Sequence, residues 1–230
     1  MKSLIIILIA LLTSLSLVQS DEFRYKRERM VRHQIEGRGI SDESTLKAMK
    51  NVQRHLFVPE ELKQNAYDDR PLPIGYGQTI SQPYIVAYMT EIILPRKGQK
   101  VLEIGTGSGC QAAVLAEIVD TVYTIEIITE LSNSAEQRLK KLNYKNVYVK
   151  NADGYYGWKE AAPFDAIVVT AAAEFVPPPL IEQLKDGGKM IIPVGSPFLN
   201  QNLVLIEKKK NKVTSKNLIP VRFVPFTRGK

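Results

Sequence analysis

The chain has 230 residues, 44% of them hydrophobic, which suffices for one sizeable domain of ordinary globular composition. Its net charge of +7 mildly favours acidic partners, but the basic residues are scattered, and the one dense run, KKKNK at 208–212, is more typical of a solvated hairpin tip; we therefore expect no nucleic-acid binding. The single cysteine, Cys110, excludes an internal disulfide and a CxxC site, and two distant histidines, His33 and His55, argue against a metal site.

Residues 1–20 have the organisation of a secretory signal peptide. Lys2 precedes an apolar core that runs from Leu4 to Leu12, and small or apolar residues lead to a cleavage point after Ser20. The apolar run is too short to be assigned as a membrane-spanning helix. The alternative is a misassigned start codon, with Met30 as the true start. We expect a signal-like segment at 1–20 and a single domain at 21–230.

The next part of the chain predicts a helical cap. A helical pattern runs from Phe23 to about Lys50 with a break at 37–39, and Ser41 is a plausible N-cap for its second half. HLFVPEEL, at 55–62, reads as an extended segment that docks against a core. A polar loop, PIGYGQTISQP at 73–83, then leads into a helix predicted from Gln82 to Ile93.

From Lys97 onwards, short apolar runs alternate with amphipathic helices. Strands are predicted at KVLEIG, TVYTIEI, NVYVKNA, FDAIVVTAAA and KMIIPVG, with helices at GCQAAVLAEIV, LSNSAEQRLKKL and PPPLIEQL. This alternation predicts an α/β fold with a doubly wound, mainly parallel, Rossmann-like sheet. The last two runs, NLVLIEKKK and IPVRFVPF, have no helix between them and predict an antiparallel hairpin at one edge.

The segment VLEIGTGSGC lies at the first strand-to-helix turn of that sheet. Gly105, Gly107 and Gly109 permit a tight turn and let the backbone approach a ligand at the carboxyl end of the strand. The spacing is GxGxG with Glu103 two residues before it, and Cys110 stands where the nicotinamide fingerprint needs Gly or Ala. No Lys-Ser/Thr pair of a phosphate-binding loop is present, so the segment favours a nucleoside without a pyrophosphate.

Two further acidic residues suit such a ligand. Glu126 ends the second predicted strand, where a carboxylate can accept hydrogen bonds from both ribose hydroxyls. Asp153, in NADG after the third strand, can accept from the adenine amine, and Gly154 leaves room for the ring; the alternative is a plain Asp-Gly turn. The set of candidate residues favours S-adenosyl-L-methionine over NAD.

The motifs together resemble one known family. FVP, PIGYGQTISQP, VLEIGTGSG, NADG, VVTAAA, QLKDGGKMIIPVG and VRFVPF come in the order found in protein-L-isoaspartate O-methyltransferases, over roughly residues 28 to 226. Cys110 departs from the pattern, which usually has an aromatic residue there. The resemblance implies a class I methyltransferase fold and methyl transfer from S-adenosyl-L-methionine to the free carboxylate of L-isoaspartyl residues in damaged proteins and peptides, a repair reaction.

The polar loop at 73–83 is then expected to hold the acceptor carboxylate. Ser81 is the predicted catalytic residue, with Gln78, Thr79 and Thr170 on the substrate side; the alternative for Ser81 is a helix cap before Pro83. Two rival functions remain open, a class I methyltransferase for another acceptor and a non-catalytic binding protein. We expect a monomer in the cytoplasm, where the cofactor is made, with export to the periplasm or medium as the alternative.

Overall fold

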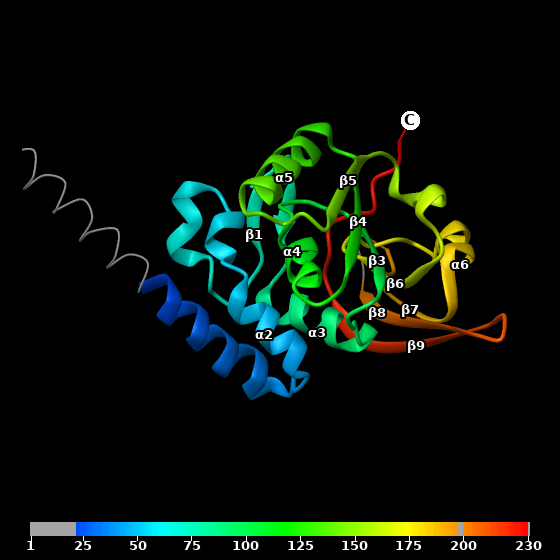
Figure 1. Ribbon diagram of the computed structural model, residues 1–230, viewed down its shortest axis with the longest axis horizontal. Coiled ribbons are helices and arrows are strands. Elements are labelled where there is room, and N and C mark those ends of the chain that lie inside the picture. Colours follow the sequence, from blue (N-terminus) through cyan, green and yellow to red (C-terminus); the bar gives the residue numbers. More distant parts are fainter. Residues whose placement is uncertain (1–21, 197–199, 230) are drawn as a thin grey trace, which may run out of the picture.

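A seven-stranded sheet forms the centre of the molecule in the computed structural model, which describes residues 22–196 and 200–229 (Figure 1). The strand order is β5-β4-β3-β6-β7-β8-β9. The strands are β3 (Lys100–Ile104), β4 (Thr121–Glu126), β5 (Val147–Asn151), β6 (Phe164–Val169), β7 (Leu184–Val194), β8 (Gln201–Lys209) and β9 (Lys212–Val221).

The order of the strands confirms the predicted doubly wound sheet. β3 pairs in parallel with β4 on one side and with β6 on the other. The strands β4 and β5 are therefore added to one side of β3 and the later strands to the other, and the strand order reverses there. β5 and β7 extend the parallel part, and β8 and β9 add the predicted antiparallel edge hairpin. Ligands of such sheets bind beyond the carboxyl ends of the strands at this reversal.

Helices cover both faces of the sheet. Successive residues of a strand point to opposite faces, so in β3 Val101 joins the cluster under α3 and α4, while Leu102 joins the cluster under α6. Both residues are fully buried, as expected for strands covered on both sides. The helices are α3 (Pro83–Ile93), α4 (Cys110–Ala116), α5 (Thr129–Lys141) and α6 (Pro178–Gln183), with short turns η5 (Gly154–Tyr156) and η6 (Lys159–Ala161) beside α6.

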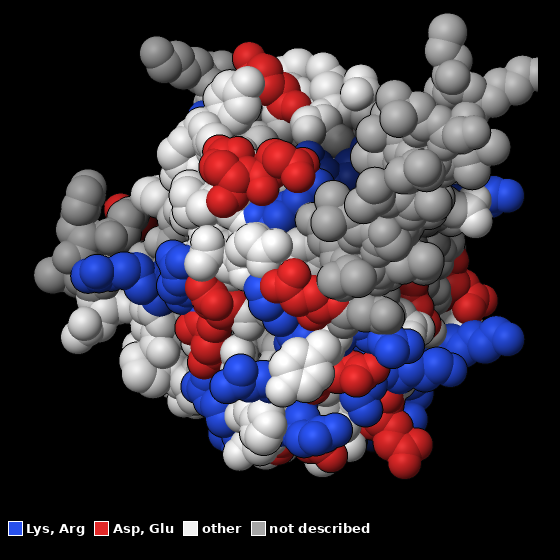
Figure 2. Space-filling view, turned by 90° about the vertical axis from the view of Figure 1, so that its left-hand side faces the viewer, with Lys and Arg blue, Asp and Glu red and all other residues white. Residues whose placement is uncertain are grey.

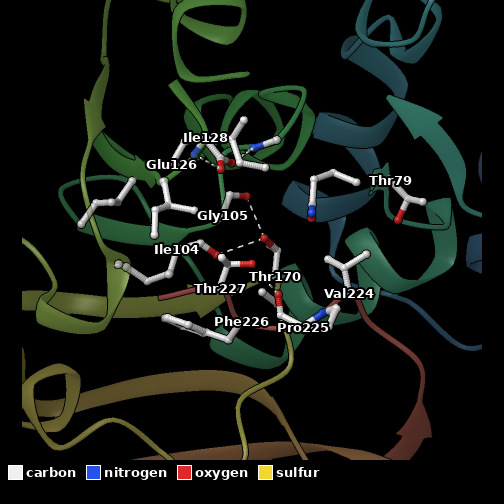
Figure 3. A pocket seen from close by; sticks show the side chains of 16 residues that line it. Thr79, Ile104, Gly105, Glu126, Ile128, Thr170, Val224, Pro225, Phe226 and Thr227 are labelled. Carbon is white, nitrogen blue, oxygen red and sulfur yellow. Dashed lines mark hydrogen bonds between the residues drawn. The ribbon is translucent and has the colours of Figure 1, made fainter. Parts of the chain in front are cut away.

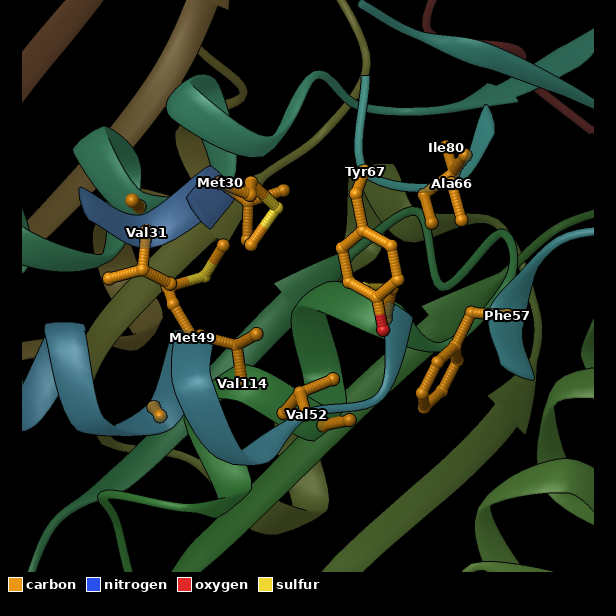
Figure 4. Close-up of a cluster of buried hydrophobic side chains, with 14 of the residues drawn as sticks. Met30, Val31, Met49, Val52, Phe57, Ala66, Tyr67, Ile80 and Val114 are labelled. Atoms are coloured by element: carbon orange, nitrogen blue, oxygen red, sulfur yellow. The ribbon is translucent and has the colours of Figure 1, made fainter. Parts of the chain in front are cut away.

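The predicted helical cap packs beside α3 and α4 and has its own core (Figure 4). Met30, Met49, Phe57 and Val114 are buried together there, the last of them contributed by α4. The cap consists of a helical stretch at 22–30, η1 (Val31–Ile35), η2 (Glu36–Arg38), α2 (Glu43–Asn51), η3 (Arg54–Phe57) and η4 (Glu60–Asn65). α4 directly follows residues 105–109, which we call the glycine segment. The cap packs against α4 and therefore lies next to this segment.

Ser41 is not the cap of the second helix. The N-cap of α2 is Asp42, whose carboxylate accepts a hydrogen bond from the Thr45 amide at 2.8 Å. Ser41 instead donates its amide to Glu91 of α3 at 2.7 Å. Aspartate is as good an N-cap as serine, so the local pattern fitted either residue.

The polar segment at 73–83 is a β-hairpin rather than a loop. β1 (Leu72–Gly75) pairs with β2 (Gln78–Ile80), and the turn residues Tyr76 and Gly77 have φ angles of 54° and 70°. Two successive positive φ values are typical of the tight turns that match the twist of a hairpin. The strands of four and three residues are too short for a visible alternation of polar and apolar residues.

The C-terminal prediction was wrong in its extent. β9 ends at Val221, whereas the expected strand reached Phe226, and the hairpin turns at Lys210 and Asn211 within the lysine-rich run. Beyond Val221 the chain leaves the sheet and returns towards the end of β5 (red in Figure 1). Residues 222–229 therefore lie at the end of the sheet where ligands bind.

The predicted signal-like segment at 1–20 lies outside the described residues. Within 22–196 and 200–229, no helix is long and apolar enough to cross a membrane. On the side of the molecule shown in Figure 2, basic and acidic side chains are interspersed over the described surface.

Candidate active site

A pocket with about 560 Å³ of empty space, open solvent included, lies beyond the carboxyl ends of β3, β4 and β6. This is the position predicted from the reversal of the sheet. Its lining brings together seven of the predicted residues and part of the C-terminal tail (Figure 3): Gln78, Thr79, Gly105, Gly107, Glu126, Gly154 and Thr170, with Thr227 from the tail.

Gly105 takes the first turn of the glycine segment directly after β3. Its φ angle is 96°, and its amide donates to the carbonyl of Ile125 in β4 at 2.8 Å. The Thr170 hydroxyl donates to the carbonyls of Gly105 and Ile104, at 2.7 and 3.0 Å. A Cβ atom on residue 105 would collide with that hydroxyl oxygen. Thr170, expected on the substrate side, therefore also braces the glycine segment.

Glu126 lies at the end of β4 and faces the pocket. Its carboxylate accepts one hydrogen bond at each oxygen, from the Gly107 amide at 2.8 Å and the Ile128 amide at 3.0 Å. A carboxylate has about four acceptor sites, so two remain for a ligand. The two amides fix the orientation of the carboxylate before a ligand arrives.

Asp153 is more heavily engaged than the sequence implied. One oxygen accepts from the Tyr155 amide at 3.0 Å, and the other accepts from Arg228 Nε at 2.9 Å and the Gly229 amide at 3.1 Å. Gly154 lines the pocket, and a Cβ there would collide with Ile104. Sequence reasoning missed Arg228, because nothing local links two residues 75 positions apart.

Glu103 and Gly109 support the glycine segment from outside the main pocket. Gly109 caps α4 with a φ angle of 88°, and a Cβ there would press on Leu139 of α5. Glu103 is fully buried; one oxygen accepts a short hydrogen bond from Thr124, and Oε1 has no hydrogen-bond partner. It borders a second, smaller cavity shared with Ser81 and Cys110.

Burial raises the pKa of the Glu103 carboxyl from its ordinary 4.5 to about 8. The folded protein thus keeps a proton that the unfolded chain releases above pH 4.5. The stabilisation from this proton is complete below pH 4.5 and is lost as the pH rises through 8.

Glu103→Gln, which stays neutral, should remove that pH dependence. Relative to the parent chain, its free energy of unfolding should rise with pH by up to about 1.4 kcal/mol per unit across this window. Urea unfolding of both proteins at about pH 5 and about pH 8 measures the difference. Glu136→Gln on the exposed face of α5 is the control. Parallel stability curves for Glu103→Gln and the parent would show that Glu103 is ionised in the folded state.

The hairpin formed by β1 and β2 borders a wide groove beside the main pocket. We call it the acceptor hairpin, because the sequence predicts that this segment holds the acceptor carboxylate. Ser81 and Thr79 line this groove together with Thr170 and with Arg222 and Phe223 of the tail. Gln78 lies instead against the main pocket. The N-cap of α3 is Gln82, with no side-chain cap, and Pro83 opens the helix. The interpretation of Ser81 as a helix cap is therefore wrong.

A buried arginine holds the acceptor hairpin in place. Arg54 is 2% exposed, and its guanidinium donates to the carbonyls of Ser81 and Ala66, both at 2.7 Å. Its third contact is the Cys110 sulfur, 4.0 Å away, at the start of α4. Sequence reasoning missed Arg54, since its only local signal is an arginine in a short helical turn. Cys110 packs against this guanidinium under the glycine segment.

Among residues 22–196 and 200–229, no group of three His, Cys, Asp or Glu side chains is arranged to hold a metal ion.

Proteins of similar sequence share one description. A family model described as protein-L-isoaspartate(D-aspartate) O-methyltransferase matches residues 25–230. A protein-L-isoaspartate O-methyltransferase from Opitutus terrae is 58% identical over 205 residues, which cover 89% of this chain and 88% of the relative. One from Nitrosospira multiformis is 58% identical over 92% of this chain and 91% of its own length.

Solved structures agree with the sequence relatives. A protein-L-isoaspartate O-methyltransferase superposes with a TM-score of 0.78 at 30% identity, over 86% of this chain and 65% of the other. A putative member from Plasmodium falciparum, solved in complex with S-adenosyl-L-homocysteine, gives a TM-score of 0.76 at 27% identity, over 88% and 99% of the two chains. The chain belongs to the protein-L-isoaspartate(D-aspartate) O-methyltransferase family.

Proposed function

We propose that this chain transfers a methyl group from S-adenosyl-L-methionine to the free carboxylate of L-isoaspartyl residues in damaged proteins and peptides. The observation that carries the proposal is the junction of two spaces: Thr79 and Thr170 border both the main pocket and the open groove. A methyl donor in the pocket and a peptide in the groove would meet at these residues. The relatives' names and the S-adenosyl-L-homocysteine complex of the Plasmodium falciparum protein support the same chemistry.

The residues of the pocket fit a nucleoside cofactor. Glu126 retains two acceptor sites for ribose hydroxyls. Asp153 is not part of the pocket lining, but it precedes Gly154, which is, and its carboxylate retains one acceptor site for an amine. Gly105 and Gly154 lack the Cβ atoms that would collide with Thr170 and Ile104. Apolar side chains on the remaining walls, such as Ile128, suit a flat base. S-adenosyl-L-methionine supplies a methyl group already activated by a positively charged sulfur.

The chain's own residues need only to position the acceptor. A carboxyl with an ordinary pKa of about 3.9 is ionised at neutral pH, so no general base is required. The hydroxyls of Thr79 and Ser81 can donate to the carboxylate oxygens and hold them in line with the donor. Such positioning can contribute about 7–11 kcal/mol to lowering the barrier. Arg222, exposed in the groove, adds positive charge that suits an acidic peptide.

A methyl-transfer assay on paired peptides tests the proposal. The two peptides have one sequence and differ only in an isoaspartyl or an aspartyl linkage, and labelled methyl groups are counted on each. We expect transfer to the isoaspartyl peptide alone. Transfer to a small acid but to neither peptide would favour another acceptor. Cofactor binding without transfer to any acceptor would favour a binding protein.

Glu126→Gln should weaken cofactor binding and leave the fold intact. The amide removes the charge and replaces one acceptor oxygen with a donor, so a ribose hydroxyl or the Gly107 amide loses its partner. The expected loss is about 1–3 kcal/mol of binding free energy, the usual result of unpairing a buried polar group. Isothermal titration calorimetry with S-adenosyl-L-homocysteine measures it; an unchanged affinity would remove Glu126 from the site.

We also propose that residues 21–230 form a single domain and that the protein acts in the cytoplasm. The location is proposed because S-adenosyl-L-methionine is made there. The signal-like pattern of residues 1–20 supports the alternative, a periplasmic or secreted protein. Cell fractionation followed by N-terminal sequencing separates the two. A mature chain beginning at Asp21 in an exported fraction would contradict the cytoplasmic assignment.

A monomer that works without metal completes the proposal. The acceptor hairpin and the cofactor pocket belong to one chain, so activity needs no second copy. Light scattering on the purified protein measures its mass, and the assay is repeated after dialysis against a chelator. A dimeric mass or lost activity would overturn the corresponding part.

A further inference from the structure

The C-terminal tail crosses the mouth of the main pocket. We call residues 224–229 the C-terminal strap. At its start it is fastened by backbone hydrogen bonds to the segment after β6: the Ala172 amide donates to Val224, and the Phe226 amide donates to Ala172, both at 2.8 Å. Pro225, Phe226 and Thr227 then line the pocket opposite the glycine segment (Figure 3).

A second fastening lies at Asp153, next to the pocket-lining Gly154. Arg228 donates from Nε to its carboxylate at 2.9 Å, and the Gly229 amide donates to the same oxygen at 3.1 Å. The Arg228 guanidinium also lies over the ring of Tyr155, 3.7 Å from its centroid. Asp153 in turn accepts from the Tyr155 amide. The strap is thus attached at both ends, with only the pocket-lining residues between.

The two fastenings differ in kind. The one at Ala172 is made of backbone groups, which form a parallel bridge between Ala172 and Pro225. The one at Asp153 combines the Gly229 amide with the side chain of Arg228, which is 43% exposed, and exposed ion pairs and cation–π contacts are individually weak. A contact of this strength can open and close many times during a reaction cycle, so the strap should open at its Arg228 end.

We propose that Arg228 is a positioning residue that latches the C-terminal strap over the cofactor pocket and thereby sets how fast the cofactor and its demethylated product leave. The inference rests on the proposed function in one respect, the identity of the ligand. Arg228 acts through two neighbours. It holds Thr227 against the pocket, and it orients the Asp153 carboxylate beside the pocket-lining Gly154. Oδ1 of that carboxylate accepts one hydrogen bond, from the Tyr155 amide, and so keeps an acceptor site.

The opposite role for Arg228 is also chemically reasonable and makes the proposal testable. If Arg228 competed with the ligand for Asp153, its removal would free the carboxylate and slow ligand release. A latch predicts faster release. The two roles therefore give changes of opposite sign in one measured rate.

The experiment compares Arg228→Ala and Arg228→Lys with the parent chain. Dissociation of S-adenosyl-L-homocysteine is followed by surface plasmon resonance. The rate should rise about tenfold in Arg228→Ala, which corresponds to about 1.4 kcal/mol. Arg228→Lys keeps the positive charge but loses the planar guanidinium that stacks on Tyr155. We therefore expect a smaller rise in the dissociation rate than in Arg228→Ala. Lys140→Ala, which breaks an exposed ion pair on α5, is the control and should match the parent.

Hydrogen exchange on the cofactor-free proteins provides a readout that needs no ligand. In Arg228→Ala the amides of residues 226 to 229 should exchange faster than in the parent, while those of α5 stay unchanged. An unchanged or slower dissociation rate in Arg228→Ala overturns the latch, as does unchanged exchange in the strap. If S-adenosyl-L-homocysteine binds none of the proteins, including the parent, the proposed function fails, and the exchange data still decide whether Arg228 fastens the strap.

Discussion

Replacement of Ser81 by alanine is expected to lower kcat on an isoaspartyl peptide by about 10- to 1,000-fold, the range for removing one well-placed donor from a developing reaction centre. Ser81 borders the groove and the cavity beneath the glycine segment, and its hydroxyl caps no helix. The Arg54 hydrogen bond to the Ser81 carbonyl fixes the backbone on which that hydroxyl is carried. The hydroxyl therefore has a fixed position at the groove and is available to donate a hydrogen bond to the substrate.

Cofactor affinity separates this role from a loss of structure. Calorimetric binding of S-adenosyl-L-homocysteine to Ser81→Ala should match that of the parent, since the main pocket is lined by other residues. Ser215→Ala, on the exposed strand β9, removes the same atom far from the groove and should leave kcat unchanged. Full turnover by Ser81→Ala would mean that the hydroxyl does not orient the acceptor.

Gly105→Ala is expected to abolish measurable cofactor binding and to lower the free energy of unfolding by about 2–4 kcal/mol. Two effects combine at this position. A φ angle of 96° is strained for any residue with a side chain, and the new methyl group would collide with the Thr170 hydroxyl. Relief of the collision requires Thr170 to leave the carbonyls of Gly105 and Ile104, which loosens the segment that approaches the ligand.

Gly98→Ala isolates the first effect, the backbone strain. Gly98 has a similar φ angle of 86°, but a Cβ there meets nothing within 4 Å. Urea unfolding measures the loss in free energy of unfolding for both variants. The loss in Gly98→Ala gives the cost of the backbone strain, and the additional loss in Gly105→Ala gives the cost of the collision with Thr170. Equal losses of stability in the two variants would show that Thr170 yields without cost and that only the backbone strain matters.

Most of the sheet and half of the site follow from local sequence patterns. The alternation of apolar runs and amphipathic helices predicts β3 to β7, and a doubly wound order brings β3 beside β6, so Gly105 and Thr170 meet as expected. Glu126 is predictable for the same reason: a residue that ends a strand next to β3 must face the reversal of the sheet. These inferences succeed because periodicity and strand ends are local properties.

The remaining parts of the site depend on contacts between distant segments. Arg54 and Ser81 are 27 residues apart, and Asp153 and Arg228 are 75 apart, with no pattern that links either pair. The apolar run IPVRFVPF predicts a strand that reaches Phe226, yet β9 already ends at Val221. Tertiary packing overrides β-propensity there.

The edge strand β9 has a consequence for the behaviour of the protein at high concentration. It closes the strand order, and among residues 22–196 and 200–229 no strand pairs with its outer side. An unpaired edge ten residues long is a template on which another chain can add a strand and begin to aggregate. Lys212 and Lys216 place charge along this edge, and Pro220 lacks the amide that an added strand would need. These charges and this proline are features that oppose the addition of another chain to the edge.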